Sequence, residues 1–119
     1  MKLKYIETCA HVYDKTRRLT RKNLTRLGYV INEEFSTYQN YSSASGMVGY
    51  WFIIHNRTGF AIALVKNRKD IKKVLDRFDL KLFDYAYTTD NGFLEWRSSE
   101  ARYTMREQWQ AMKDEGLIA

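Results

Sequence analysis

The sequence contains no proline, a single cysteine and only two histidines among its 119 residues. The absence of proline excludes the proline-rich motifs that dock in aromatic grooves. Because Cys9 is alone, an internal disulfide and a multi-cysteine zinc site are excluded, and a reducing, cytoplasmic location is expected. No apolar run approaches the ~20 residues of a membrane span. Glu7 stands where a signal peptide would carry its apolar stretch, so we expect neither secretion nor a membrane partner.

The motifs of common catalytic sites are also missing. Six scattered glycines form neither a Walker loop nor a dinucleotide-binding turn, and no nucleophile-elbow serine occurs. His11 and His55 are the residue type that a metal-independent ribonuclease uses, but no spacing brings them together. Cys9 lies on an apolar stripe, which is typical of a core residue rather than of a reactive thiolate. The sequence therefore predicts no enzyme, no cofactor and no metal site.

Positive charge is concentrated in the first quarter of the chain. The formal net charge is +6, and residues 1–30 alone hold eight basic and two acidic side chains. Such an asymmetry predicts an acidic partner: nucleic acid, an anionic membrane surface or an acidic protein surface. The alternative is that the charge only keeps a small protein in solution.

The segment 4–27 is interpreted as one long helix. With 3.6 residues per turn, apolar side chains fall on one face, and basic side chains spaced by three or four fall on the opposite face. Gly28 stands where a left-handed residue commonly ends a helix. Thr16 and Thr20 are poor core residues and modest helix formers, so a strand over residues 2–13 is the second choice.

The middle of the chain predicts strands and a loop. Residues 29–35 favour a first strand, and residues 36–46 are rich in Ser, Asn, Tyr and Gln, which predicts a mobile loop. The clearest signal is a β-hairpin, in which apolar runs over 47–55 and 60–66 flank the loop Asn56–Gly59. Both faces of the hairpin are apolar, so helices or a partner should cover both. This loop pairs Trp51 with Leu64, Ile53 with Ile62 and, on the other face, Ile54 with Ala61.

The chain after the hairpin combines a helix with further strand signals. Asn67 is expected to cap a helix over residues 68–79. Residues 81–88 suit a strand, and a tight turn is expected after it at residues 90–92. Whether residues 93–97 return as a paired strand is left open.

The last helix has clear start and stop signals. Ser98 or Ser99 opens it, and Gly116 ends it. The predicted fold class is therefore α+β, with a single domain over residues 1–119. It comprises a long N-terminal helix, a three- to five-stranded antiparallel sheet and two further helices.

Two basic clusters form the candidate binding site. The first lies within residues 15–26, interleaved with threonine and asparagine side chains that also bond to phosphates. The second follows Asn67, where lysines and the first amides of a helix would both favour an anion. The candidate nucleic-acid-binding residues are Lys15, Arg17, Arg18, Arg21, Lys22, Arg26, Lys69, Lys72 and Lys73.

Aromatic side chains, which make up 15% of the chain, would add base stacking if they were exposed. Trp51 and Trp109 are expected in the core. Tyr38 and Tyr41 belong to the polar loop, so they are the candidate partner-contact residues.

Two main functional hypotheses follow, and a small nuclease is the third. The first is a small basic protein that binds nucleic acid or a nucleoprotein complex, mainly through phosphate contacts of its N-terminal helix, with little sequence preference. The alternative is a protein–protein inhibitor or adaptor that docks on an acidic surface. Short, basic, motif-free chains of this kind resemble the accessory proteins with which phages act on a host enzyme or defence complex. A homodimer is also left open.

Overall fold

The computed structural model describes residues 3–13, 16, 19–41, 46–89 and 93–119. Five strands form one antiparallel sheet in the order β1-β2-β3-β4-β5, and β6 and β7 form a separate two-stranded sheet. In chain order the elements are β1 (Lys4–Tyr13), β2 (Leu19–Val30), β3 (Phe35–Gln39), β4 (Trp51–His55), β5 (Ala61–Val65), the 3₁₀ helix η2 (Arg68–Asp70), α1 (Ile71–Arg77), the 3₁₀ helix η3 (Leu80–Tyr85), β6 (Ala86–Thr88), β7 (Leu94–Trp96) and α2 (Ser99–Asp114).

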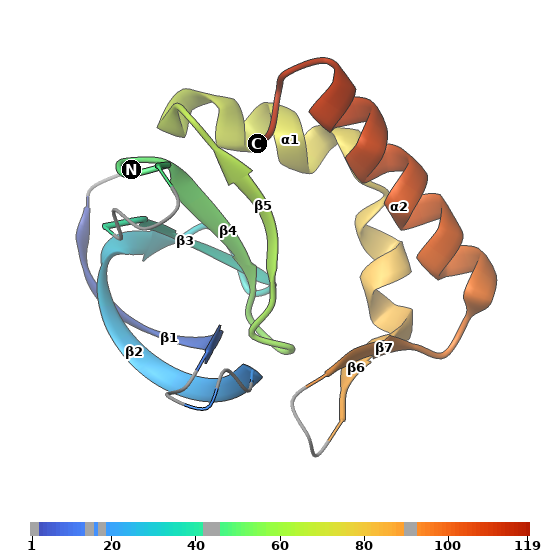
Figure 1. Ribbon diagram of the computed structural model, residues 1–119, viewed down its shortest axis with the longest axis horizontal. Helices are drawn as coiled ribbons and strands as arrows, with labels where there is room; N and C mark the ends of the chain where they lie inside the picture. Colours follow the sequence, from blue (N-terminus) through green and yellow to red (C-terminus); the bar gives the residue numbers. More distant parts are fainter. Residues whose placement is uncertain (1–2, 14–15, 17–18, 42–45, 90–92) are drawn as a thin grey trace.

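The five-stranded sheet is strongly curved. Figure 1 shows β1 and β2 sweeping away from the helices, while α1, η3 and α2 lie on the opposite side of the sheet, across from β4 and β5. The helical elements therefore cover one face of the sheet. The long β1–β2 ribbon curls over the other face.

The prediction of a long N-terminal helix is wrong, so the α+β class holds only in part. Residues 4–13 and 19–30 form the two longest strands, which pair from Lys4 opposite Gly28 to Tyr13 opposite Leu19. Threonine and tyrosine are frequent in both segments, and β-branched and aromatic side chains favour strands. A helix would also have stacked like charges one turn apart. The second choice, a strand over residues 2–13, agrees with β1.

Gly28 lies inside β2 and does not end a helix. It is buried opposite Tyr38 of β3. A Cβ atom at this position would lie 1.9 Å from the carbonyl oxygen of Thr37, far inside van der Waals contact. Glycine is therefore required by the close approach of two backbones. β2 and β3 pair over only three residues, and this contact lies at the Gly28 end of their junction.

The polar segment that predicted a mobile loop instead begins with a central strand. β2 continues to Val30, and β3 starts at Phe35 after a turn in which the Asn32 side chain accepts hydrogen bonds from two backbone amides. The prediction failed because the polar side chains of β3 are satisfied inside the fold. The Ser36 hydroxyl donates to Asn56 at 2.7 Å, and the Thr37 hydroxyl donates to the Phe52 carbonyl at 2.7 Å. Residues 42–45 lie outside the described residues.

The predicted hairpin is confirmed as β4 and β5, but its register is only partly right. Ile54 pairs with Ala61 as expected. The register then shifts between Ile53 and Ile54, so that Trp51 lies opposite Val65 instead of Leu64. A β-bulge adds one residue to one strand and is difficult to read from a sequence pattern alone.

The second half of the chain follows the prediction more loosely. The helix expected over 68–79 is divided into η2 and the seven-residue α1, and the Asn67 side chain makes no capping hydrogen bond. The strand expected over 81–88 begins only at Ala86, after η3. β7 pairs with β6, which answers the question left open for residues 93–97. The expected turn at 90–92 lies outside the described residues.

The last helix, α2, agrees with the prediction at both ends. The Ser98 hydroxyl accepts a hydrogen bond from the Ala101 amide at 3.1 Å, which is the expected N-cap. Gly116 has a φ of 75°, and the Leu117 amide donates to the Met112 carbonyl at 2.9 Å, as at a left-handed helix end.

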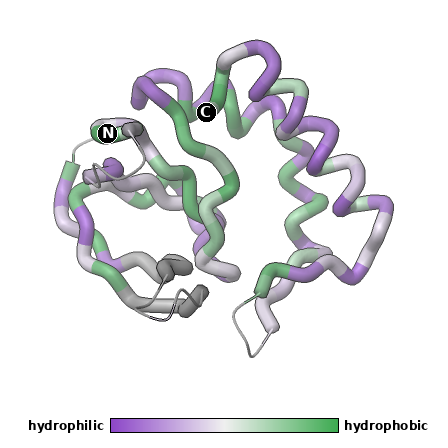
Figure 2. Tube along the Cα trace, viewed as in Figure 1, coloured by the Kyte–Doolittle hydropathy of each residue, from purple (hydrophilic) through white to green (hydrophobic). Residues whose placement is uncertain are grey.

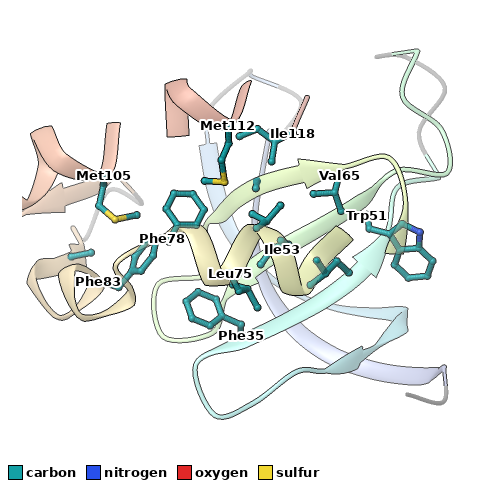
Figure 3. Close-up of a cluster of buried hydrophobic side chains, with 14 residues drawn as sticks. Phe35, Trp51, Ile53, Val65, Leu75, Phe78, Phe83, Met105, Met112 and Ile118 are labelled. Atoms are coloured by element: carbon teal, nitrogen blue, oxygen red, sulfur yellow. The ribbon is translucent and has the colours of Figure 1, made fainter. Parts of the chain in front are cut away.

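The hydrophobic core lies between the covered face of the sheet and the helical elements. Figure 3 shows Trp51 at one end of this cluster and Phe83 with Met105 at the other. Phe35 and Ile53 of the sheet are fully buried in it. The labelled core residues are Phe35, Trp51, Ile53, Val65, Leu75, Phe78, Phe83, Met105, Met112 and Ile118.

Candidate functional site

The helical face predicted to carry the first basic cluster does not form, because residues 19–30 are the strand β2. Lys15, Arg17 and Arg18 lie outside the described residues. Arg21 and Lys22 belong to β2, where their backbones pair with β1. Successive residues of a strand belong to opposite faces, so the helical spacing of these cations has no structural counterpart.

Arg26 is the one member of the first cluster whose side chain is described. It is half-buried in β2, and its guanidinium donates to the Thr25 carbonyl at 2.9 Å. It lies beside Tyr38, whose pKa is raised by burial, an effect that the positive charge of Arg26 opposes. Arg26 is therefore held against the sheet and is not fully available to a partner.

The second basic cluster is fully exposed. Within residues 66–73 there are five cations and one acidic residue, Asp70. Each cation is exposed, and only Lys73 forms an ion pair in the described structure, at 3.7 Å from Asp70. Figure 2 shows the change from the hydrophobic β5 to the hydrophilic turn that leads into α1. We call this surface the α1 basic patch: Lys66, Arg68, Lys69, Lys72 and Lys73.

Arg68 connects the α1 basic patch to the sheet. Its guanidinium carbon lies 5.7 Å from the ring centroid of Trp51, within the range of a cation–π contact. Its charge also acts on Tyr29 of β2, where it opposes the rise in pKa that burial causes. The patch therefore lies beside the C-terminal end of β2, the strand that also carries Arg26.

The two tyrosines predicted to contact a partner have different environments. Tyr38 is only 8% exposed, because it lies in β3 and its ring packs 5.2 Å from that of Phe52. The structure therefore places Tyr38 inside the sheet and not in a polar loop. Tyr41 follows the strand and is 56% exposed, so it stays a candidate contact residue.

His55 is a buried structural residue. Its side chain is 3% exposed, its Nδ1 lies 2.8 Å from the Thr58 hydroxyl, and its ring stacks on Phe83 at 5.0 Å. Burial lowers the pKa of His55 to about 4, with a further contribution from Arg57, while Asp84 acts in the opposite direction. His11 belongs to β1, which is separated from β4 by two strands in the sheet. The arrangement gives no support to an acid–base pair of these histidines.

The low pKa of His55 predicts acid sensitivity. The unfolded chain takes up a proton on this imidazole near pH 6.5, whereas the folded protein does so only near pH 4. Between these values the unfolded state binds more protons, so stability falls as the pH falls. We expect His55 to contribute a loss of about 3 kcal/mol between pH 7 and pH 4. Urea denaturation at a series of pH values, compared with His55→Gln, measures this contribution. Parallel pH profiles of the two proteins would contradict it.

A cleft that the sequence did not predict lies between the beginning of β5 and the helix α2. It has a volume of about 440 Å³. Aromatic and aliphatic side chains dominate its walls, and two arginines, Arg102 and Arg106, stand one turn apart on α2. The full lining is Phe60, Ala61, Ile62, Phe78, Phe83, Leu94, Trp96, Arg102, Met105, Arg106, Trp109 and Gln110.

The loop of the β4–β5 hairpin is hydrogen-bonded to the segment that contains the core residue Phe83. The Arg57 guanidinium donates to the carbonyls of Phe83 and Ala86, each at 2.7 Å. The Thr88 hydroxyl donates to the Thr58 carbonyl at 3.1 Å. These bonds fix the hairpin loop to η3 and β6. The four-residue spacing of Arg102 and Arg106 is visible in the sequence, but nothing in it indicates which edge of the sheet α2 approaches.

A scan against protein-family models finds no match, and searches of curated proteins and of solved structures find none either. Within the described ranges, no helix has the length and apolar character that crossing a membrane requires. In the same part of the chain, no three His, Cys, Asp or Glu side chains gather as a metal-binding group.

Proposed function

We propose that this protein binds nucleic acid through phosphate contacts of the α1 basic patch. The exposed patch carries the proposal, because five cations within eight residues are balanced by one carboxylate. Phosphate groups release condensed counterions when such cations neutralise them, which drives binding with little sequence preference. No catalytic step is part of the proposed function.

The contact between Arg68 and Trp51 favours a role in nucleic-acid binding over a surface that only contacts solvent. Its contact with Trp51 orients the guanidinium and reduces the conformational entropy that is lost on binding. Lys69 and Lys72 follow on the exposed side of η2 and α1, without an ion pair in the described structure. Three exposed cations thus offer phosphate contacts next to one another.

The salt dependence of binding tests this proposal. Lys69→Gln combined with Lys72→Gln removes two phosphate contacts, so the slope of log affinity against log salt should decrease by about 1.8 for duplex DNA. All sequences should be weakened alike, because phosphate contacts carry no base information. Fluorescence anisotropy with labelled duplex DNA and duplex RNA, between roughly 50 and 200 mM salt, measures the slope.

A matched control separates this surface from net charge. Lys81→Gln combined with Arg97→Gln removes the same two charges from exposed positions outside the patch. The control should keep the slope of the parent protein. If both double variants change the slope equally, only the total charge matters. If neither protein nor variant binds either duplex at ~50 mM salt, nucleic-acid binding is wrong.

A further inference from the structure

Helix α2 gives the cleft a wall that is apolar along one row of side chains and cationic along the next. With 3.6 residues per turn, Met105 and Trp109 form one row on the helix surface. Arg102 and Arg106 form the neighbouring row. Met105 is buried and Trp109 is half-buried, whereas both arginines are exposed. The two cations therefore stand on the solvent side of the apolar row.

The rest of the cleft lining is dominated by aromatic rings. Phe78 and Phe83 are buried, and the half-buried Trp96 of β7 packs on Phe83 with ring centroids 5.9 Å apart. Figure 3 shows Phe83 and Met105 together at one end of the core. Aromatic rings contact one another edge to face or in offset stacks, which adds to the gain from burial. A flat aromatic group is therefore the apolar body that suits these walls best.

The two arginines of this wall are available to an anion. Neither forms an ion pair in the described structure. On α2 itself, Glu100 and Glu107 belong to the opposite side of the helix. A guanidinium group binds a carboxylate or a similar anion through forked hydrogen bonds, and two such groups one turn apart can act on the same anion. The exposed side of the cleft thus has an unused capacity for negative charge.

The position of α2 is set by contacts outside the cleft. The Gln108 side chain accepts a hydrogen bond from the Asp79 amide at 2.9 Å, and Arg77 of α1 pairs with Glu115 at 2.6 Å. Both contacts exist without a ligand. Binding in the cleft therefore needs little ordering of the chain, which favours affinity for a small molecule.

We propose that the cleft binds a small aromatic anion, whose rings lie against Trp96 and Trp109 and whose carboxylate or similar anionic group meets Arg102 and Arg106. Its volume of about 440 Å³ falls within the roughly 300–1,000 Å³ of clefts that hold small organic molecules. The aromatic lining specifies the body of the ligand, and the two cations specify its charged end. This site is separate from the α1 basic patch and extends the function beyond phosphate binding.

Two matched dyes test the proposal. Anilinonaphthalene sulfonate combines an aromatic body with one anionic group, and phenylnaphthylamine has the same rings without the sulfonate. Each dye is titrated against the folded protein, and its fluorescence is followed. The sulfonate dye should bind at one site per chain. Naphthoate should displace it, whereas the uncharged naphthamide at the same concentration should not.

Two double variants make the test specific. Arg102→Gln combined with Arg106→Gln should weaken the sulfonate dye by about tenfold or more, since charge-assisted hydrogen bonds are lost, and should leave the uncharged dye unaffected. Lys4→Gln combined with Lys81→Gln removes the same charge elsewhere and should leave both affinities unchanged. All four side chains are exposed, and an unchanged melting temperature shows that each variant is folded.

The indole N–H resonances of the three tryptophans locate the bound dye. Trp96 and Trp109 line the cleft, while Trp51 lies at the other end of the core (Figure 3). The sulfonate dye should shift the resonances of Trp96 and Trp109 and leave that of Trp51 in place. A shift of Trp51 alone, equal weakening by both double variants, or equal loss of both dyes in the arginine variant would overturn the proposal.

Discussion

Replacing Gly28 by alanine is expected to lower the free energy of unfolding by about 4 kcal/mol or more, which is a large fraction of the stability of a domain this size. The new Cβ would lie 1.9 Å from the Thr37 carbonyl oxygen, and both atoms belong to paired backbones that cannot turn aside. β2 and β3 must therefore separate, and their three-residue junction is the only strand pairing that attaches the β1–β2 ribbon to the rest of the sheet among the described residues. Urea denaturation measures the loss.

Gly46→Ala is the control for this substitution. Gly46 has a φ of 70°, but nothing lies within 4 Å of the added Cβ. We expect a cost of roughly 1 kcal/mol from backbone conformation alone. If Gly28→Ala costs no more than Gly46→Ala, the close approach of β2 to β3 is wrong, and so is the strand assignment of residues 19–30.

Trp51→Ala is expected to destabilise the protein by about 3–5 kcal/mol. Trp51 is 8% exposed and lies opposite Val65 in the sheet, so its removal leaves a large cavity at one end of the core. The substitution also removes the ring that orients Arg68. Chemical denaturation measures the first effect, and a weaker affinity for duplex DNA in the folded variant would report the second.

Tyr103→Ala provides the comparison for an exposed aromatic residue. Tyr103 lies on α2 and is 66% exposed, so its removal should change stability by less than about 0.5 kcal/mol. A Trp51→Ala protein that unfolds at the same urea concentration as Tyr103→Ala would show that Trp51 is not part of the core.

The elements that sequence reasoning predicted correctly are those specified by local signals. The β4–β5 hairpin combines two apolar runs with a turn that contains Gly59, which has a φ of 75°. Helix α2 has a serine cap at Ser98 and a glycine stop at Gly116. Each signal acts within a few residues, so no tertiary contact is needed to interpret it.

The N-terminal segment was not predictable in this way because its residues satisfy two periodicities. Ile6, Cys9 and Val12 share a helical face, yet the same segment forms a strand that pairs with β2, from Tyr13 opposite Leu19 to Lys4 opposite Gly28. Tertiary pairing overrides a weak local preference. The burial of Ser36 and Thr37 also depends on neighbours that are distant in the sequence.

Some features of the candidate site could likewise be predicted from local signals, and others could not. The exposed cations Lys69, Lys72 and Lys73 could be predicted, because a run of like charges must face solvent whatever the local structure is. The environment of Tyr38 could not, since a polar, serine-rich neighbourhood is typical of a loop. The cleft was also beyond sequence reasoning. It arises where α2 approaches the edge of β5, and that arrangement is a property of the whole fold.

Chemical-shift mapping tests the central claim most directly. Isotope-labelled protein is titrated with a short duplex of arbitrary sequence at low salt, and the backbone amide resonances are followed. The account predicts that the largest changes occur at residues 66–73, that they diminish as salt is added, and that Arg102 and Arg106 do not respond. Binding without changes at residues 66–73, or with changes confined to the cleft beside α2, would contradict the claim that the α1 basic patch holds nucleic acid.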